Sequence, residues 1–199
     1  MKNYERYQNI STEEYDKKKL MYYLTRRCAD KKILPYIKEL KNNLILDAGI
    51  GTGYYAKYML KDNKLTGVDI NPHLCKLPVE MLAGDAAKLS DTVSGRKFDI
   101  VFSAWLTEYL DQEQLFNFFR DSHKILDSNG KLISTIITNG GIGLLYVTAA
   151  EKIRKIKKYC YSKKTILSKL QQAGFSNTRI IELPSYLKIP WAYMLIAEK

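Results

Sequence analysis

The chain has 199 residues, enough for one sizeable hydrophobic core and too few for two comfortable domains, so we expect a single domain over residues 1–199. No apolar run is long enough to span a bilayer, and the polar start at residues 1–19 is unlike a secretory signal. These two features predict a cytoplasmic protein. Its net charge is +11. With two histidines and three widely spaced cysteines, we predict no metal site and no disulfide framework; the cysteines are Cys28, Cys75 and Cys160.

The N-terminal part of the chain is predicted to be helical. Residues 12–40 show helical spacing of apolar side chains, with a break expected near residues 29–31. Residues 1–41 carry 11 basic and 6 acidic side chains, so this segment forms one of two basic flanks of the chain. A basic flank favours anionic partners.

The most informative stretch is residues 44–53, which read Leu-Ile-Leu-Asp-Ala-Gly-Ile-Gly-Thr-Gly. It predicts a buried strand that turns into a helix through three glycines, whose bare backbone and free N–H groups suit a nucleotide-type ligand. A dinucleotide fingerprint needs a glycine where Tyr54 stands, and a phosphate loop needs Lys directly after Gly53. We therefore do not expect the loop to cradle a pyrophosphate.

The acidic residue at the end of this strand indicates the charge of the ligand. A carboxylate beside the loop repels phosphate and suits an ammonium or sulfonium group. Here the chain resembles the class I S-adenosylmethionine-dependent methyltransferases, whose first motif is an apolar strand ending in Asp or Glu, followed by Gly-x-Gly-x-Gly. The resemblance implies that S-adenosylmethionine is bound by the matching residues Asp47, Gly49, Gly51 and Gly53.

A second short strand is predicted over residues 64–69 and ends in Asp69. In the resembled family this carboxylate accepts hydrogen bonds from both ribose hydroxyls of the cofactor. The resemblance also implies that Ile70 packs on the adenine face. The competing interpretation for each such Asp is a strand-end carboxylate without a ligand.

Two further strands continue the pattern, near residues 79–83 and 98–103. After the first of them, the resemblance implies that Asp85 meets the adenine amino group and that the main chain of Ala86 meets the ring. The second ends in Ser103, at the position that lies close to the methionine part of the cofactor in this family.

The C-terminal part of the chain completes the sheet. Residues 125–133 resemble the family's turn before strand five, with Gly130 supplying a tight turn before a strand over 130–138. Residues 173–175 resemble the link from the last large helix into strand six, and residues 191–197 suit an antiparallel final strand.

Alternating short strands and helices predict an α/β fold: a doubly wound, mostly parallel seven-stranded sheet with helices on both faces. The resemblance implies that residues 1–41 form N-terminal capping helices over a cofactor-binding core at 42–199.

The second basic flank is residues 151–169, with eight basic side chains and one acidic. It overlaps a predicted basic amphipathic helix over about 142–160, whose apolar stripe is Ile142, Tyr146, Ala149, Ile153, Ile156 and Cys160. Three interpretations of such a helix are open. It packs its apolar stripe on the domain and exposes its lysines to water, it lies on an anionic membrane surface, or it binds RNA phosphates. The resemblance places it near the path of the acceptor, so an anionic or lipid-linked acceptor and a peripheral membrane location are hypotheses.

The segment after the fourth strand indicates the kind of acceptor. Enzymes of this superfamily that methylate exocyclic amino groups carry Asn or Asp, then Pro-Pro and an aromatic residue, whereas residues 103–106 here read Ser-Ala-Trp-Leu. The run resembles the small-molecule and lipid-intermediate branch. RNA methylation, and a catalytically silent S-adenosylmethionine-binding module that acts through a partner, remain the alternatives.

The resemblance implies in-line displacement, in which the acceptor's nucleophile attacks the sulfonium-bound methyl group. Because the methyl group is already activated, a general base is needed only for an acceptor that keeps its proton at neutral pH. Glu108, just past the fourth strand, is the catalytic candidate; the competing interpretation is an exposed carboxylate favoured by a helix N-terminus. Arg26, Arg27 and Lys19 are candidates for binding the cofactor's carboxylate.

Overall fold

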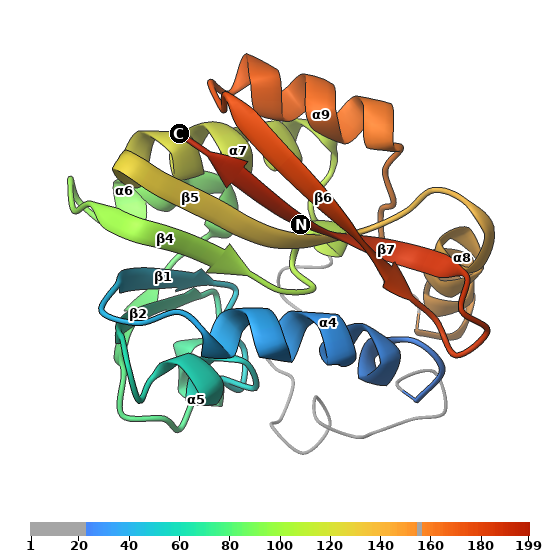
Figure 1. Ribbon diagram of the computed structural model, residues 1–199, viewed down its shortest axis with the longest axis horizontal. Helices are drawn as coiled ribbons and strands as arrows, with labels where there is room; N and C mark the ends of the chain where they lie inside the picture. The colour runs from blue at the N-terminus through green and yellow to red at the C-terminus, as the bar shows by residue number, and fades with distance from the viewer. Residues whose placement is uncertain (1–22, 155–156) are drawn as a thin grey trace.

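The computed structural model, which describes residues 23–154 and 157–199, has three layers with a central sheet between two layers of helices (Figure 1). Seven strands follow the order β3-β2-β1-β4-β5-β7-β6. Their bounds are β1 Leu44–Ala48, β2 Lys64–Asp69, β3 Glu80–Ala83, β4 Phe98–Ser103, β5 Leu126–Ile137, β6 Asn177–Pro184 and β7 Pro190–Glu198. The predicted fold class and the predicted strands are confirmed.

The strand pairing brings the predicted motifs to one edge of the sheet. Strands β1 to β5 pair in parallel, and β7 runs antiparallel between β5 and β6. In β1, Asp47 is opposite Gly67 of β2 and Phe102 of β4. Because parallel strands end at the same edge, the segments that follow β1, β2 and β4 meet there.

Alternate strand residues pack against opposite helix layers, as a doubly covered sheet requires. One layer contains α4 Arg26–Lys38, α5 Ala56–Met59 and α8 Gly141–Arg154. The other contains α6 Leu89–Thr92, α7 Gln112–Ile125 and α9 Lys163–Gln172. Three short 3₁₀ turns lie in the connections, namely η1 Pro72–Leu74, η2 Ala86–Lys88 and η3 Thr107–Tyr109.

Helix α7 illustrates how the local sequence sets an element. The Asp111 side chain caps it by accepting hydrogen bonds from the backbone N–H groups of the second and third helical residues. In return, the Gln114 side-chain oxygen accepts a hydrogen bond from the Asp111 N–H at 3.0 Å. Leu115, Phe118 and Phe119 follow at helical spacing and are fully buried. The helix therefore begins at a polar cap and is fixed by an apolar face.

The predicted helix break at residues 29–31 is wrong. Helix α4 runs without interruption across these residues, and the turn lies earlier, at Thr25. Asp30 does not end the helix because its carboxylate accepts hydrogen bonds from the hydroxyl groups of Tyr54 and Tyr55. The predicted helix before residue 23, and with it most of the capping segment, lies outside the described residues.

The prediction of one basic amphipathic helix over 142–160 is also wrong, at residues 157–160. Helix α8 ends at Arg154, and residues 157–160 are not helical. There the Tyr159 N–H donates to the carbonyl of Glu108 at 2.7 Å. This tertiary contact holds the segment beside η3.

Gly130 lies in a bulge instead of the predicted tight turn. Strand β5 already begins at Leu126, and its register with β4 shifts between Phe98 and Ile100, so that β5 has extra residues there. A Cβ at Gly130 would lie 3.0 Å from the carbonyl oxygen of Asp127, which explains the glycine.

Candidate active site

The glycine loop after β1 has a backbone that only glycine adopts without strain. Gly49, Gly51 and Gly53 have φ angles of 74°, 53° and 79°. A Cβ at Gly49 would lie 2.9 Å from the Leu106 side chain, and one at Gly53 would lie 2.6 Å from Leu77. At Gly49 and Gly53 the loop is thus packed too closely against Leu106 and Leu77 for side chains.

Asp69 lies directly against this loop. Its carboxylate accepts hydrogen bonds from the N–H of Gly51 at 2.9 Å and of Asn71 at 2.8 Å. Burial raises the pKa of Asp69, and the N–H groups of Asn71, Gly51 and Ile70 offset part of the rise. The segments that follow β1 and β2 therefore meet at one edge of the sheet.

Asp47 is buried at the end of β1, with 3% of its surface exposed. Burial, with a contribution from Asp69, raises its pKa to about 8. Within the described part of the chain its carboxylate has no hydrogen bond, and the buried hydroxyl of Ser103 also lacks one. Two polar groups at the carboxyl edge of the sheet are thus left for a ligand to satisfy.

Asp85 and Ala86 lie in the loop after β3. The Asp85 carboxylate accepts from the Ala87 N–H at 2.9 Å and so caps η2, while Ala86 is buried. The N–H of Gly84 donates to the Asp69 carbonyl at 3.0 Å, which fixes this loop beside the end of β2. Ile70 is half-buried at the same edge.

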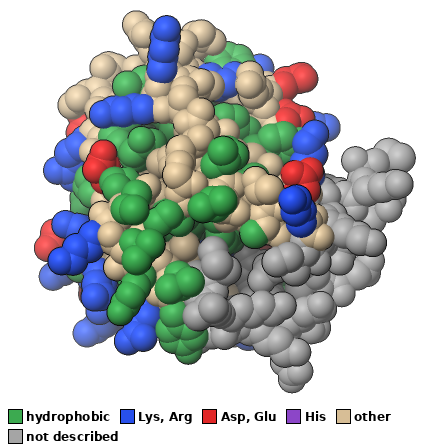
Figure 2. Space-filling model, turned by 90° about the vertical axis from the view of Figure 1, so that its right-hand side faces the viewer, with side chains coloured by type: hydrophobic (Ala, Val, Ile, Leu, Met, Phe, Trp, Pro, Cys, Tyr) green, Lys and Arg blue, Asp and Glu red, His purple; other side chains and the backbone are tan. Residues whose placement is uncertain are grey.

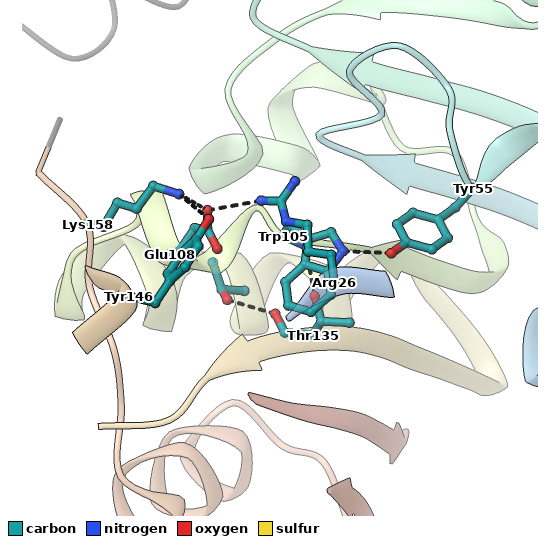
Figure 3. A network of polar contacts seen from close by, with 8 residues as sticks. Arg26, Tyr55, Trp105, Glu108, Thr135, Tyr146 and Lys158 are labelled. Atoms are coloured by element: carbon teal, nitrogen blue, oxygen red, sulfur yellow. Dashed lines mark hydrogen bonds and ion pairs between the residues drawn. The ribbon is translucent and has the colours of Figure 1, made fainter. Parts of the chain in front are cut away.

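Glu108 is not the exposed carboxylate of the competing interpretation, because it is only 1% exposed. Its Oε1 pairs with Arg26 at 3.3 Å and with the buried ammonium of Lys158, which also donates to the Tyr146 hydroxyl at 3.1 Å (Figure 3). Among the described residues Oε2 has no partner. One carboxylate therefore lies between two cations and keeps one oxygen unpaired.

Lys158 was not identified from the sequence, where it counts among the lysines of a charged helix face. Burial alone lowers its pKa, but Glu108 and Tyr146 outweigh this, and the pKa of Lys158 is raised above its ordinary value. It therefore stays charged in the interior. No sequence pattern links it to Glu108, which lies 50 residues earlier.

Trp105 connects this network to the cofactor loop. Its φ is 61°, a strained value for a large residue, and its N–H groups donate to the Thr135 hydroxyl at 2.8 Å and the Tyr55 hydroxyl at 2.7 Å. The Arg26 guanidinium lies 5.1 Å from the Trp105 ring, and the indole of Trp191 stacks on it at 5.0 Å. Figure 3 shows the indole between Tyr55 and Arg26.

The chain of contacts from Trp105 continues into helix α4. Tyr55 donates to Asp30 at 2.6 Å, and Tyr54 donates to the same carboxylate at 2.9 Å. Tyr54, which stands where a dinucleotide site needs glycine, thus ties the loop to α4. Of the candidates for the cofactor's carboxylate, Arg26 lies within this network, Arg27 lies over the exposed Tyr23 ring, and Lys19 is outside the described residues.

Metal ligands are not gathered in the described residues, where no group of three or more His, Cys, Asp or Glu side chains could hold an ion. A glycine loop with bare backbone and buried carboxylates lies at the carboxyl edge of a doubly wound sheet, beside a charged network. This combination defines a Rossmann-like α/β protein with a candidate ligand site at the carboxyl edge of its sheet.

Comparisons with known proteins make the class specific. Residues 46–134 match the methyltransferase domain family. The chain is 25% identical over 165 residues to a tRNA U34 carboxymethyltransferase of Pectobacterium carotovorum, covering 76% of this chain and 50% of that protein. It is 23% identical over 116 residues to a malonyl-[acyl-carrier protein] O-methyltransferase of Hamiltonella defensa, covering 56% and 44%.

The solved structures agree in fold. Magnesium protoporphyrin IX methyltransferase from Synechocystis, with bound S-adenosylhomocysteine, matches with a TM-score of 0.68 and 16% identity over 100% of this chain and 94% of that chain. The chain spans about half the length of the first curated relatives that it matches. Within this chain, residues 46–134 are similar to a methyltransferase domain, and the solved structures share its fold.

Proposed function

We propose that this chain transfers a methyl group to a small acceptor that is anionic or lipid-linked. The observation that carries the proposal is the buried group of Glu108, Arg26 and Lys158, which follows β4 at the same edge as the cofactor loop. One carboxylate between two cations leaves a net positive charge. Such a site attracts an acceptor with an anionic group.

The residues at the loop fit the cofactor. When bound, S-adenosylmethionine supplies a methyl group activated on a sulfonium. We assign the main chain of Gly49 and Gly53 to the methionine part of the cofactor, and the carboxyl group of Asp47, once ionised, suits its positive charge. We assign Asp69 to the ribose, with Gly51 and Ser103 completing the cofactor site.

The adenine side of the site is assigned on the same basis. Asp85 would accept from the adenine amino group, Ala86 would face the ring edge through its main chain, and Ile70 would pack on the ring. These residues follow β2 and β3, whose ends are joined by the hydrogen bond from Gly84 to Asp69.

Glu108 is proposed to orient the acceptor. Its unpaired Oε2 is buried and can accept a hydrogen bond from an O–H or N–H of the acceptor, while Arg26 and Lys158 hold Oε1. The carboxylate then fixes the nucleophilic atom and takes its proton where the acceptor keeps one at neutral pH.

RNA is the second candidate acceptor, favoured by the basic residues 151–169 and by the similarity to a tRNA-modifying enzyme. A silent cofactor-binding module is the third.

The test follows labelled methyl groups from S-adenosylmethionine into a cell extract, fractionated into lipid, nucleic-acid, protein and small-molecule pools. Asp69→Ala is the control, because it removes the loop's carboxylate partner. Label in the lipid or small-molecule pool, absent with the control, supports the proposal, whereas label in nucleic acid establishes the RNA alternative. Tight cofactor binding without label in any pool contradicts methyl transfer.

A matched variant tests the role of Glu108. Glu108→Gln keeps the size of the side chain and removes its charge. Once an acceptor pool is known, we expect kcat to fall by about 100-fold while the Kd for the cofactor stays unchanged. An unchanged kcat would exclude this role.

A further inference from the structure

One end of the molecule exposes large apolar side chains on two neighbouring elements. In the loop between β6 and β7, Tyr186, Leu187 and Ile189 are 69%, 67% and 47% exposed, and on α8 Leu144 and Leu145 are 50% and 69% exposed. Figure 1 places α8 and this loop at the same end, and Figure 2 faces that end and shows hydrophobic side chains gathered on it. We call these five residues the apolar end.

The loop holds its side chains outward in one fixed conformation. The Ser185 N–H donates to the Ile189 carbonyl at 2.9 Å, and the Lys188 N–H donates back to Ser185 at 3.0 Å. The Tyr186 N–H donates to the carbonyl of Leu24, at the start of the α4 region, at 2.8 Å. Tight loops normally carry polar residues, so a rigid loop that presents Tyr and Leu to solvent indicates a binding surface.

The surroundings of the apolar end are basic. Lys188 is exposed within the loop, Lys152 is exposed on α8, and Lys163 and Lys164 are exposed at the start of α9. Residues 151–169 contain only one acidic side chain, Glu151. Aromatic and aliphatic side chains beside lysines match a bilayer interface, where the rings enter the headgroup region and the ammonium groups reach lipid phosphates.

We infer that the apolar end docks on the surface of an anionic lipid bilayer. No described helix is long and apolar enough to cross a membrane, so this contact is an interfacial one. The basic charge complements anionic headgroups, and the exposed apolar side chains supply the hydrophobic part of the contact. Among the alternatives, RNA would not require Leu144, Leu145 and Leu187 to face solvent.

Docking here would bring the acceptor side of the active site to the lipid surface. Trp191 lies just after the loop and stacks on Trp105. Its ring lies 5.4 Å from the ring of Tyr146, whose hydroxyl group accepts the hydrogen bond from Lys158. The inference deepens the proposed function by favouring a lipid-linked acceptor. Only this statement about the acceptor rests on the proposed function.

The test is co-sedimentation of the full chain with vesicles, without cofactor. We expect binding to vesicles of equimolar phosphatidylcholine and phosphatidylglycerol, weaker binding to phosphatidylcholine alone, and loss of binding in high salt. The double variant Tyr186→Ser/Leu187→Ser should lower the affinity by about tenfold or more. The control Leu44→Ser changes a 42% exposed leucine at the amino end of β1, and should bind like the wild type.

Four results would overturn the inference, of which the first three concern vesicle binding and oligomeric state. The first is that the wild type does not bind the anionic vesicles. The second is that the double variant binds them equally well with an unchanged melting temperature. The third is a wild-type dimer that the double variant converts to a monomer, which would assign the surface to a second copy. Loss of RNA binding instead of vesicle binding would likewise assign it to RNA. Because vesicle binding is measured without cofactor, its failure leaves methyl transfer to be judged separately by the label experiment.

Discussion

Replacing Asp47 by Asn should remove a pH-dependent penalty on folding. The pKa of Asp47 is about 8 in the folded protein, against its ordinary 3.8. Between these values the folded protein holds a proton that the unfolded chain has lost. The stability that this group contributes is therefore complete below about pH 4 and is lost as the pH rises towards 8.

The magnitude follows from the single proton. Each pH unit within this window changes the free energy of unfolding of the wild type, relative to Asp47→Asn, by about 1.4 kcal/mol. From about pH 5 to pH 7 the difference amounts to about 3 kcal/mol. Asp69 stays in both proteins, so its own raised pKa largely cancels in the comparison.

The assay is urea unfolding of both proteins at several pH values without cofactor. Wild type and Asp47→Asn should converge at low pH and diverge in favour of the variant towards neutral pH. Parallel pH dependence of the two proteins would refute the reasoning. In calorimetry at neutral pH, cofactor binding should release a proton from the wild type and not from the variant, because a bound cation favours the ionised carboxylate.

Three further substitutions test the packing around the site. Gly49→Ala should cost more stability than Gly95→Ala, since both positions have positive φ but only Gly49 has a neighbour within 4 Å; equal losses in thermal unfolding would mean that the contact with Leu106 does not matter. Lys158→Met should destabilise by about 3 kcal/mol, because it leaves a buried carboxylate with one partner fewer, and a loss below 1 kcal/mol by chemical unfolding would contradict the pairing. Tyr55→Phe should lower the free energy of unfolding by about 2 kcal/mol, because the indole N–H of Trp105 loses the Tyr55 hydroxyl to which it donates. Unaltered Trp fluorescence and an unaltered melting temperature would speak against that bond.

The sequence was sufficient for most of the sheet. Strands β1, β2 and β4 are apolar runs bounded by turns, and period and length identify such segments reliably. Asp47, Asp69 and the glycines are set by local chain geometry, so their proximity followed from the parallel sheet alone. The roles of these residues toward a cofactor stay predictions, as do those of Asp85 and Ala86.

The acceptor side could not be predicted because it depends on contacts distant in sequence. The pairing of Lys158 with Glu108 overrides the helical period that continues past Arg154. The helix break at 29–31 was predicted from local sequence, whereas the hydrogen bonds from Tyr54 and Tyr55 keep Asp30 within α4. In both places tertiary contacts decide where the helix ends.

The position of β7 has a consequence for the nascent chain. Among the described strands, β7 at residues 190–198 is the only one beside β6 and is the second neighbour of β5. Until the ribosome has released residues 190–198, β5 has an open edge of apolar residues and β6 has no strand to pair with. Chaperones that shield exposed strand edges would therefore act on this chain between the synthesis of β5 and that of β7, and slower translation over residues 138–190 would lengthen that interval.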